Sequence, residues 1–341
     1  MALELGLDTF GDVTHGADGA LQHQAQVIRE VVEQGIMADQ AGVDVISLGE
    51  HHRADFAISS PETVLAAIAT RTSRIRLGSG VTVLSSDDPI RVFQRFSTLH
   101  AISQGRAEVI VGRGSFIESF PLFGHDLDDY ERLFEEKLDL FNHLIRDTRV
   151  TWTGTIHPGL HDQPVFPPTE SQLKTWIGVG GSPESVVRAA RYNLPLMLAI
   201  IGGPATRFRP YVDLYLRAHT QAGTTPQPIG VHSPGHVAAT DALAREQYWA
   251  GYKAMHDTIG RERGWPPITP ADFLREIEQG AMYVGSPDTV AKKIAATVQA
   301  LGLSRFQLKY SAGPVAHAHS REAIRLYGET VMPMVRDFVA G

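Results

Sequence analysis

VISLGEHH, residues 45–52, opens the stretch that decides the fold of this chain. Two more apolar runs follow it: IRL at 75–77, which leads into GSGVTVL at 78–84, and VIV at 109–111, which leads into GRGS at 112–115. Each run resembles a strand that ends in a polar or glycine-rich tip and is followed by a helix-like run. Chemistry in parallel α/β folds sits at the carboxyl ends of the strands, so a site is expected at these tips.

The same alternation extends over the whole chain. Ser60-Pro61, Asp88-Pro89, Ser182-Pro183 and Ser286-Pro287 are typical helix starts, with a capping side chain before a proline. Strand-like runs alternate with helices at 3–8, 43–48, 75–84, 107–111, 175–179, 195–201, 229–239 and 305–310. This pattern predicts an α/β fold, a (β/α)8 TIM barrel that forms a single domain over residues 1–341. A doubly wound open sheet is the main structural alternative.

Two segments break the rhythm and are predicted to be irregular insertions. One covers about 150–170, where prolines and the sequence TWTGT suggest a loop or a short hairpin, and the other covers about 264–282. The loops 116–127, 151–168 and 264–280 are expected to shape the mouth of the barrel. Because such loops vary freely, the sequence does not identify a substrate.

Composition excludes several classes of function. The chain has 341 residues, 43% of them hydrophobic and 20% charged, which is ordinary for a globular protein with a large core. A net charge of -7 without a basic block argues against a nucleic-acid partner. No apolar run reaches the roughly 20 residues that span a bilayer, and the first residues lack a secretion signal, so a cytoplasmic protein is expected. Without cysteine there is no disulfide or thiolate nucleophile.

A glycine-rich turn at 180–185, GGSPES, joins a predicted strand to a helix. Free amides at a helix start attract anions, glycines let a ligand approach the backbone, and the serines add hydroxyl donors. Arg113, at another strand tip, offers a planar fork suited to phosphate. A phosphate site is therefore one interpretation. An ordinary capped turn and an arginine paired with a neighbouring carboxylate are the alternatives.

Two adjacent histidines, His51 and His52, stand at the tip of the second predicted strand, between Glu50 and Arg53. Successive strand residues point to opposite sides, so one ring can face the mouth while the other lies in a supporting layer. Imidazole can give or take a proton near neutral pH. The alternative is that both rings are held by local hydrogen bonds.

A metal site is not expected, although histidine pairs at 232/236, 317/319 and 157/161 resemble ligand pairs. None of them belongs to a His-Glu-x-x-His motif. The chain also lacks a Gly-x-Ser-x-Gly elbow and a Walker-type loop, which argues against a serine hydrolase and an NTPase. A partial dinucleotide fingerprint begins at Gly178, but its third glycine position holds Pro183.

In order and spacing, several of these segments closely resemble the bacterial luciferase-like, flavin-dependent monooxygenases. They are VISLGEHH at 45–52, SP at 60–61, RIRLGSGVTVL at 74–84, DPIR at 88–91, QGR at 104–106 leading to GRG at 112–114, GGS at 180–182, and NLP at 193–195. The resemblance covers most of the chain and is densest between residues 43 and 115.

The resemblance implies an enzyme that binds reduced FMN at the barrel mouth. Such an enzyme uses O2 to oxygenate a small aldehyde-, ketone- or sulfonate-like substrate. A separate flavin reductase and a homodimer through the helices that follow the early strands are implied as well. A deazaflavin-dependent hydride transferase and a non-catalytic flavin-binding barrel remain alternatives.

By position, His51 matches the catalytic histidine of the family and His52 its neighbour. Gly80-Val81 matches a non-proline cis peptide that lies against the flavin ring. The implied cofactor-binding residues are Ser79, Gly80, Val81, Arg113, Gly114, Ser115, Gly180, Gly181, Ser182 and Ser185. Two departures stand out: Gly112 replaces a cysteine of bacterial luciferase, and Phe116 replaces a nearby tyrosine. Light emission and the luciferase substrate are therefore not expected.

Overall fold

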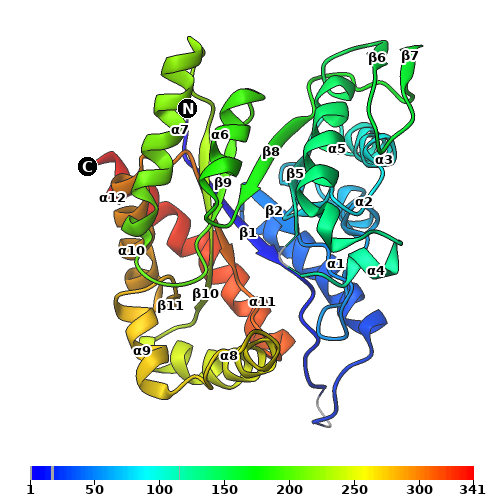
Figure 1. Cartoon of the computed structure of the whole chain (residues 1–341). Helices are drawn as coiled ribbons and strands as arrows, with labels where there is room; N and C mark the ends of the chain where they lie inside the picture. Colours follow the sequence, from blue (N-terminus) through cyan, green and yellow to red (C-terminus); the bar gives the residue numbers. More distant parts are fainter. Residues whose placement is uncertain (1, 17–18, 115) are drawn as a thin grey trace.

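A closed barrel of parallel strands forms the centre of the molecule in a computed structural model, which describes residues 2–16, 19–114 and 116–341 (Figure 1). Within these ranges the eight barrel strands follow one another in chain order, and the ring closes because the last strand pairs with both its predecessor and the first. They are β1 (Glu4–Thr9), β2 (Val45–Leu48), β3 (Arg76–Ser79), β5 (Ala107–Gly112), β8 (Lys174–Val179), β9 (Leu196–Ala199), β10 (Ile229–Val237) and β12 (Arg305–Lys309). Closure confirms the predicted TIM barrel and excludes an open sheet.

Helices surround the barrel and begin largely where the capping pairs predicted (Figure 1). Asp88 accepts a hydrogen bond from Arg91 N at 3.0 Å, and Ser182 accepts one from Ser185 N at 3.3 Å. Ser60 makes no side-chain cap, although Pro61 still opens its helix. The main helices are α1 (Gln24–Gln40), α2 (Pro61–Ala69), α3 (Pro89–Ile102), α5 (Tyr130–Leu144), α6 (Pro183–Arg191), α7 (Arg209–Ala222), α8 (Asp241–Arg263), α10 (Pro287–Leu301), α11 (His317–Leu326) and α12 (Met332–Ala340).

Three segments differ from their predictions. The expected strand 75–84 is divided into β3 and the short β4 (Thr82–Val83), with a cis peptide between Gly80 and Val81. The segment 264–282 is not irregular, because it contains α9 (Pro270–Glu278), which begins with a reciprocal capping box between Thr269 and Asp272 and leads to β11 (Tyr283–Gly285). The closing helix, expected to run without interruption over 321–339, is divided into α11 and α12 by a π-helical turn at Tyr327–Val331.

The segment 150–168 forms the predicted hairpin, β6 (Val150–Trp152) with β7 (Leu160–Gln163). It packs on the outer helices: Trp152 Nε1 donates to Asp139 of α5 at 2.8 Å, and Gln94 of α3 donates to Phe166 O at 3.0 Å. The expectation that this segment shapes the barrel mouth is therefore wrong. The hairpin follows a helix and precedes a strand, so it covers the outside of the barrel instead.

A buried ion pair fills the amino end of the barrel. Glu108 of β5 and Arg305 of β12 are both fully buried, and Arg305 Nη2 lies 3.0 Å from Glu108 Oε2. Burial opposes ionisation of Glu108, but the attraction of Arg305 outweighs it and lowers the pKa of Glu108 to about 2. The Arg305 guanidinium also lies over the Trp176 ring, 4.4 Å from its centroid. This end is therefore plugged, and a ligand site must lie at the opposite, carboxyl end.

Candidate active site

The cis peptide Gly80-Val81 lies at the barrel mouth, as predicted. Both residues are partly exposed, whereas Ser79 before them is fully buried. The Ser79 hydroxyl accepts hydrogen bonds from Thr82 Oγ1 at 2.9 Å and from Ile110 N at 3.2 Å. Ser79, one of the expected cofactor contacts, thus holds the turn in place and does not present its hydroxyl to the mouth.

Val81 occupies the space that side chains at two glycines would need. An added Cβ would lie 2.9 Å from Val81 Cγ2 at Gly112, and 2.8 Å from Val81 Cγ1 at Gly178. Real side chains do not approach this closely, so either substitution would force Val81 to move. This packing gives a physical reason for glycine at position 112, where bacterial luciferase has a cysteine.

His51 lies in a box of phenylalanine rings contributed by three segments. Its ring centroid lies 4.4 Å from Phe10, 4.7 Å from Phe56 and 5.0 Å from Phe116. Burial, followed by the charges of Lys309 and Arg53, lowers the pKa of His51 to about 3. His51 is therefore neutral near pH 7, where it can accept a proton or form a hydrogen bond but carries no positive charge.

His52 lies in a different environment, as the alternation along the strand tip predicted. Its Nε2 lies 2.9 Å from Glu50 Oε1, and Glu50 Oε2 accepts a hydrogen bond from Val83 N at 2.8 Å. The outer face of the ring contacts Phe123 edge-on. Through Glu50, His52 supports the backbone of β4, directly after the cis peptide.

Arginines and hydroxyls gather where the tips of β5 and β8 meet. Arg113 forms an ion pair with Glu131 of α5, and the same carboxylate lies 3.3 Å from Arg188 Nη2 of α6. Arg188 Nη1 also donates to Ser185 Oγ at 3.1 Å. The structure therefore brings Arg113 and the start of α6 together, as expected, and adds Arg188, which the sequence reasoning missed. Its position three residues after Ser185 on one helix was the available signal.

The charges of these groups act on Glu184, at the start of α6. The pKa of Glu184 is lowered by its own backbone N–H and by the Ser182 hydroxyl, which donates to it at 2.8 Å, and then by the charges of Arg113 and Arg188. The arginines of this cluster pair with carboxylates of α5 that solvent reaches: Glu131 is 60% exposed, and Glu135, which pairs with Arg188 Nε, is 37% exposed. A bound phosphate can displace such groups.

The glycines around this cluster allow backbone conformations that other residues rarely adopt, and Gly180 leaves the backbone open. Gly114 and Gly181 adopt positive φ angles, +80° and +125°, which residues with side chains rarely adopt. An added Cβ at Gly180 would meet no atom within 4 Å. Two arginines, a helix amino terminus and an open backbone fit a phosphate group. Ser115, also expected here, lies outside the described residues.

Three of the histidines considered as metal ligands have other partners. His232 Nδ1 lies 2.6 Å from Asp8 Oδ2, His236 Nε2 lies 2.8 Å from Gln247 Oε1, and His317 Nδ1 lies 2.9 Å from Gln34 Nε2. In the described part of the chain, no three His, Asp, Glu or Cys side chains are placed to bind a metal ion together.

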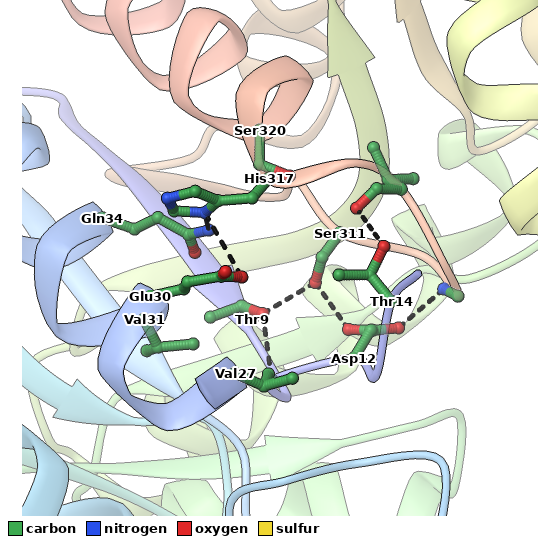
Figure 2. Close-up of a pocket in the computed structure, with 13 residues that line it drawn as sticks. Thr9, Asp12, Thr14, Val27, Glu30, Val31, Gln34, Ser311, His317 and Ser320 are labelled. Atoms are coloured by element: carbon green, nitrogen blue, oxygen red, sulfur yellow. Dashed lines mark hydrogen bonds and ion pairs between the residues drawn. The ribbon is translucent and has the colours of Figure 1, made fainter. Parts of the chain in front are cut away.

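A small polar cavity of about 20 Å³ lies behind the mouth, between α1 and the segment after β12 (Figure 2). In Figure 2, Ser311 links Thr9 and Asp12: its hydroxyl lies 2.7 Å from Thr9 Oγ1 and donates to Asp12 Oδ2 at 2.6 Å. Asp12 in turn pairs with Lys309 Nζ at 3.1 Å. The cavity has room for one water molecule only, so it cannot hold a flavin. The ion pair with Asp12 holds Lys309 beside the Phe10 ring.

Residues 9–305 match the model of the luciferase-like monooxygenase family, and the chain belongs to this family. A curated relative, limonene 1,2-monooxygenase of Rhodococcus erythropolis, is 35% identical over 337 residues, which cover 93% of this chain and 86% of that protein. The chain is thus an oxidoreductase of the monooxygenase class. No helix of the described residues is long and apolar enough to cross a membrane.

Solved structures share the same fold at lower identity. The monooxygenase RslO1 from Streptomyces bottropensis has a TM-score of 0.84 at 24% identity and covers 97% of this chain and 99% of its own. The oxygenating constituent of 3,6-diketocamphane monooxygenase from Pseudomonas putida, in complex with FMN, has a TM-score of 0.78 at 20% identity, with coverage of 98% and 99%. An F420-dependent secondary alcohol dehydrogenase has a TM-score of 0.75 at 17% identity, with coverage of 99% and 100%.

Proposed function

We propose that this protein is an FMN-dependent monooxygenase that uses reduced FMN and O2 to oxygenate a small, uncharged organic substrate. The observation that carries the proposal is the convergence of Arg113, Arg188 and the amino end of α6 near Glu131, on a barrel that also holds His51 at the tip of β2, with β3 between β2 and β5. When bound, reduced FMN supplies two electrons to O2, so that one oxygen atom enters the substrate and the other leaves as water.

The proposed cofactor site has two parts. Arg113, Arg188 and the hydroxyls of Ser182 and Ser185 bind the phosphate, and the open backbone at Gly180 and Gly181 lets it approach closely. Gly80 and Val81 form a surface on which the flavin ring rests. His51 then faces the reacting atoms as a neutral base or hydrogen-bonding group, with His52 as its support.

The box around His51 favours an apolar substrate. Arg53, which lies over the Phe116 ring, is already paired with three carboxylates: Glu118, Asp55 at 3.0 Å and Glu262 at 2.8 Å. Lys309 is paired with Asp12, and Arg263, also over Phe116, lies close enough to Glu262 to help lower the pKa of that carboxyl. Because these cations have acidic neighbours, we infer an aldehyde- or ketone-like substrate in preference to a sulfonate.

The test supplies reduced FMN from an added flavin reductase together with ¹⁸O2 and a panel of aldehydes, ketones, alkenes and sulfonates. We expect one ¹⁸O atom in the product of an apolar carbonyl compound and little turnover of sulfonates. Unlabelled product, or no product from any class, would contradict the proposal. Preference for a sulfonate would contradict only the substrate inference.

A deazaflavin-dependent hydride transferase is a second candidate because an F420-dependent dehydrogenase shares the fold. The charge of -7 argues against it, since the polyglutamate tail of a deazaflavin needs positive charge around it. Parallel titrations with FMN and with F420 separate the two candidates. A barrel that binds FMN but consumes no O2 with any substrate would be a non-catalytic flavin protein.

We further propose that residues 1–341 act as one domain, that a separate cytoplasmic reductase supplies the reduced FMN, and that the protein is a homodimer through α2 and α3. Light scattering during gel filtration tests the last point. A monomer mass at micromolar concentration would contradict it.

A further inference from the structure

A second histidine lies inside the barrel near the mouth and is not among the residues assigned above. His232 of β10 places Nδ1 2.6 Å from Asp8 Oδ2 of β1, although the two residues are 224 positions apart. The His232 ring is stacked 6.2 Å from Phe10, and Phe10 contacts the His51 ring at 4.4 Å. The two histidines therefore share one aromatic neighbour.

Burial distinguishes the two members of this pair. The Asp8 side chain is only 1% exposed, and its Oδ1 has no hydrogen-bond partner among the described residues. The His232 side chain is 13% exposed, and no described residue forms a hydrogen bond with its Nε2. A buried carboxylate that accepts the Nδ1 proton fixes the ring orientation, so Nε2 is the atom left for a ligand.

His51 and His232 thus differ in what they can do. The three phenylalanines around His51 offer its ring no anionic partner, and its pKa of about 3 keeps it neutral. His232 has such a partner, because its Nδ1 lies 2.6 Å from the Asp8 carboxylate. Of the two rings, His232 is the one that a carboxylate orients, with Nε2 left to exchange a proton with a ligand.

We propose that His232, oriented by Asp8, is a proton donor of the barrel mouth. This inference rests on the proposed function. The reaction combines substrate, O2, two electrons and two protons into oxygenated product and water. The electrons and one proton come with the reduced flavin, and Nε2 of His232 gives the second proton to the oxygen atom that leaves as water. His232 regains its proton from solvent, and Asp8 acts as a positioning residue.

The first test needs no cofactor. Ring ¹⁵N chemical shifts of the labelled protein report which nitrogen of each histidine carries the proton, and the signal missing in His232→Asn assigns His232. We expect the Nδ1–H form in the neutral ring, and a shift toward the Nε2–H form in Asp8→Ala. An Nε2–H form in the parent protein would overturn the pairing on which the proposal depends.

The second test measures oxygenated product and H2O2 per reduced FMN consumed, with FMN affinity measured in parallel. We expect His232→Asn to lower the rate of product formation about 10²-fold and to raise the H2O2 share, with unchanged FMN affinity. Asp8→Asn keeps the shape of the buried side chain and should lower the rate of product formation about tenfold. The double variant should be no worse than His232→Asn alone, because the two residues act as one unit.

His143→Gln is the matched control, since it removes an exposed histidine–aspartate pair, His143 with Asp147 at 2.8 Å, from the outer surface. It should leave every readout unchanged. If the parent protein oxygenates substrate and His232→Asn does so at the same rate, the proton-donor role is wrong. If the parent protein yields no oxygenated product, the proposed function itself fails, and the donor role with it.

Discussion

Replacing Arg188 with alanine should weaken FMN binding, whereas replacing Glu131 with glutamine should strengthen it. In the structure, Glu131 pairs with both Arg113 and Arg188. Its side chain is 60% exposed, and an ion pair so accessible to solvent stabilises by about 0–1 kcal/mol. A charge-assisted hydrogen bond from arginine to phosphate contributes about 1.5–3 kcal/mol, so the phosphate should displace Glu131.

These energies set the expected changes in affinity. Loss of one arginine bond corresponds to roughly ten- to hundred-fold weaker binding, for Arg188→Ala and for Arg113→Ala alike. Removing the competing charge in Glu131→Gln recovers at most about 1 kcal/mol, which is roughly fivefold tighter binding. The FMN affinity of each variant is measured by titration of FMN fluorescence and, for reduced FMN, by titration of absorbance under anaerobic conditions.

Arg132→Ala provides the matched control. Arg132 lies next to Glu131, is 59% exposed and pairs with Asp129 at 2.9 Å. It should leave FMN affinity unchanged. Full affinity in both Arg113→Ala and Arg188→Ala would place the phosphate elsewhere and refute the reasoning, as would weaker binding in Glu131→Gln.

Three further predictions concern the other parts of the molecule. His51→Asn should lower the rate of oxygenated product formation by about 10²- to 10⁴-fold at nearly unchanged FMN affinity, and product formation at the parent's rate would remove His51 from the chemistry. Gly112→Ala should cost about 1–3 kcal/mol of unfolding free energy in a urea titration, because its Cβ would lie 2.9 Å from Val81; an unchanged titration midpoint would contradict this packing. Acidification from about pH 5 to pH 2 should remove stability supplied by the Glu108–Arg305 pair, since the pKa of Glu108 is about 2 in the folded chain against 4.5 in the unfolded one. Glu108→Gln should lower the free energy of unfolding by about 3–5 kcal/mol at pH 7. Urea titrations that show no such decrease would contradict the ion pair.

Local signals in the sequence were enough to predict the barrel. The strand periodicity between 43 and 48 and between 107 and 111 is confirmed to within two residues, and Ser182 caps its helix as predicted. The role of polar residues within buried strands, such as Glu108, could not be predicted from the sequence, because their partners are brought close only when the barrel closes. They face inward, where they pair with residues that lie nearly two hundred positions away in the sequence.

The candidate site was predictable only in part. His51 and Arg113 stand at strand tips, where the pattern itself indicated chemistry. The box around His51 was not predictable, because Phe10, Phe56 and Phe116 come from separate loops that share no spacing. The helix in the segment 264–282 was not predicted, because the sequence WPP at 265–267 and Pro270 are typical of a loop. Pro270 in fact occupies the first turn of the helix, where proline is tolerated.

The buried ion pair closes the amino end of the barrel to ligands. Glu108, Arg305 and Trp176 are fully buried there, so no organic molecule passes through the far end. Under the proposed function, cofactor and substrate would both enter from the carboxyl end of the barrel, where the loops carry His51 and Arg113.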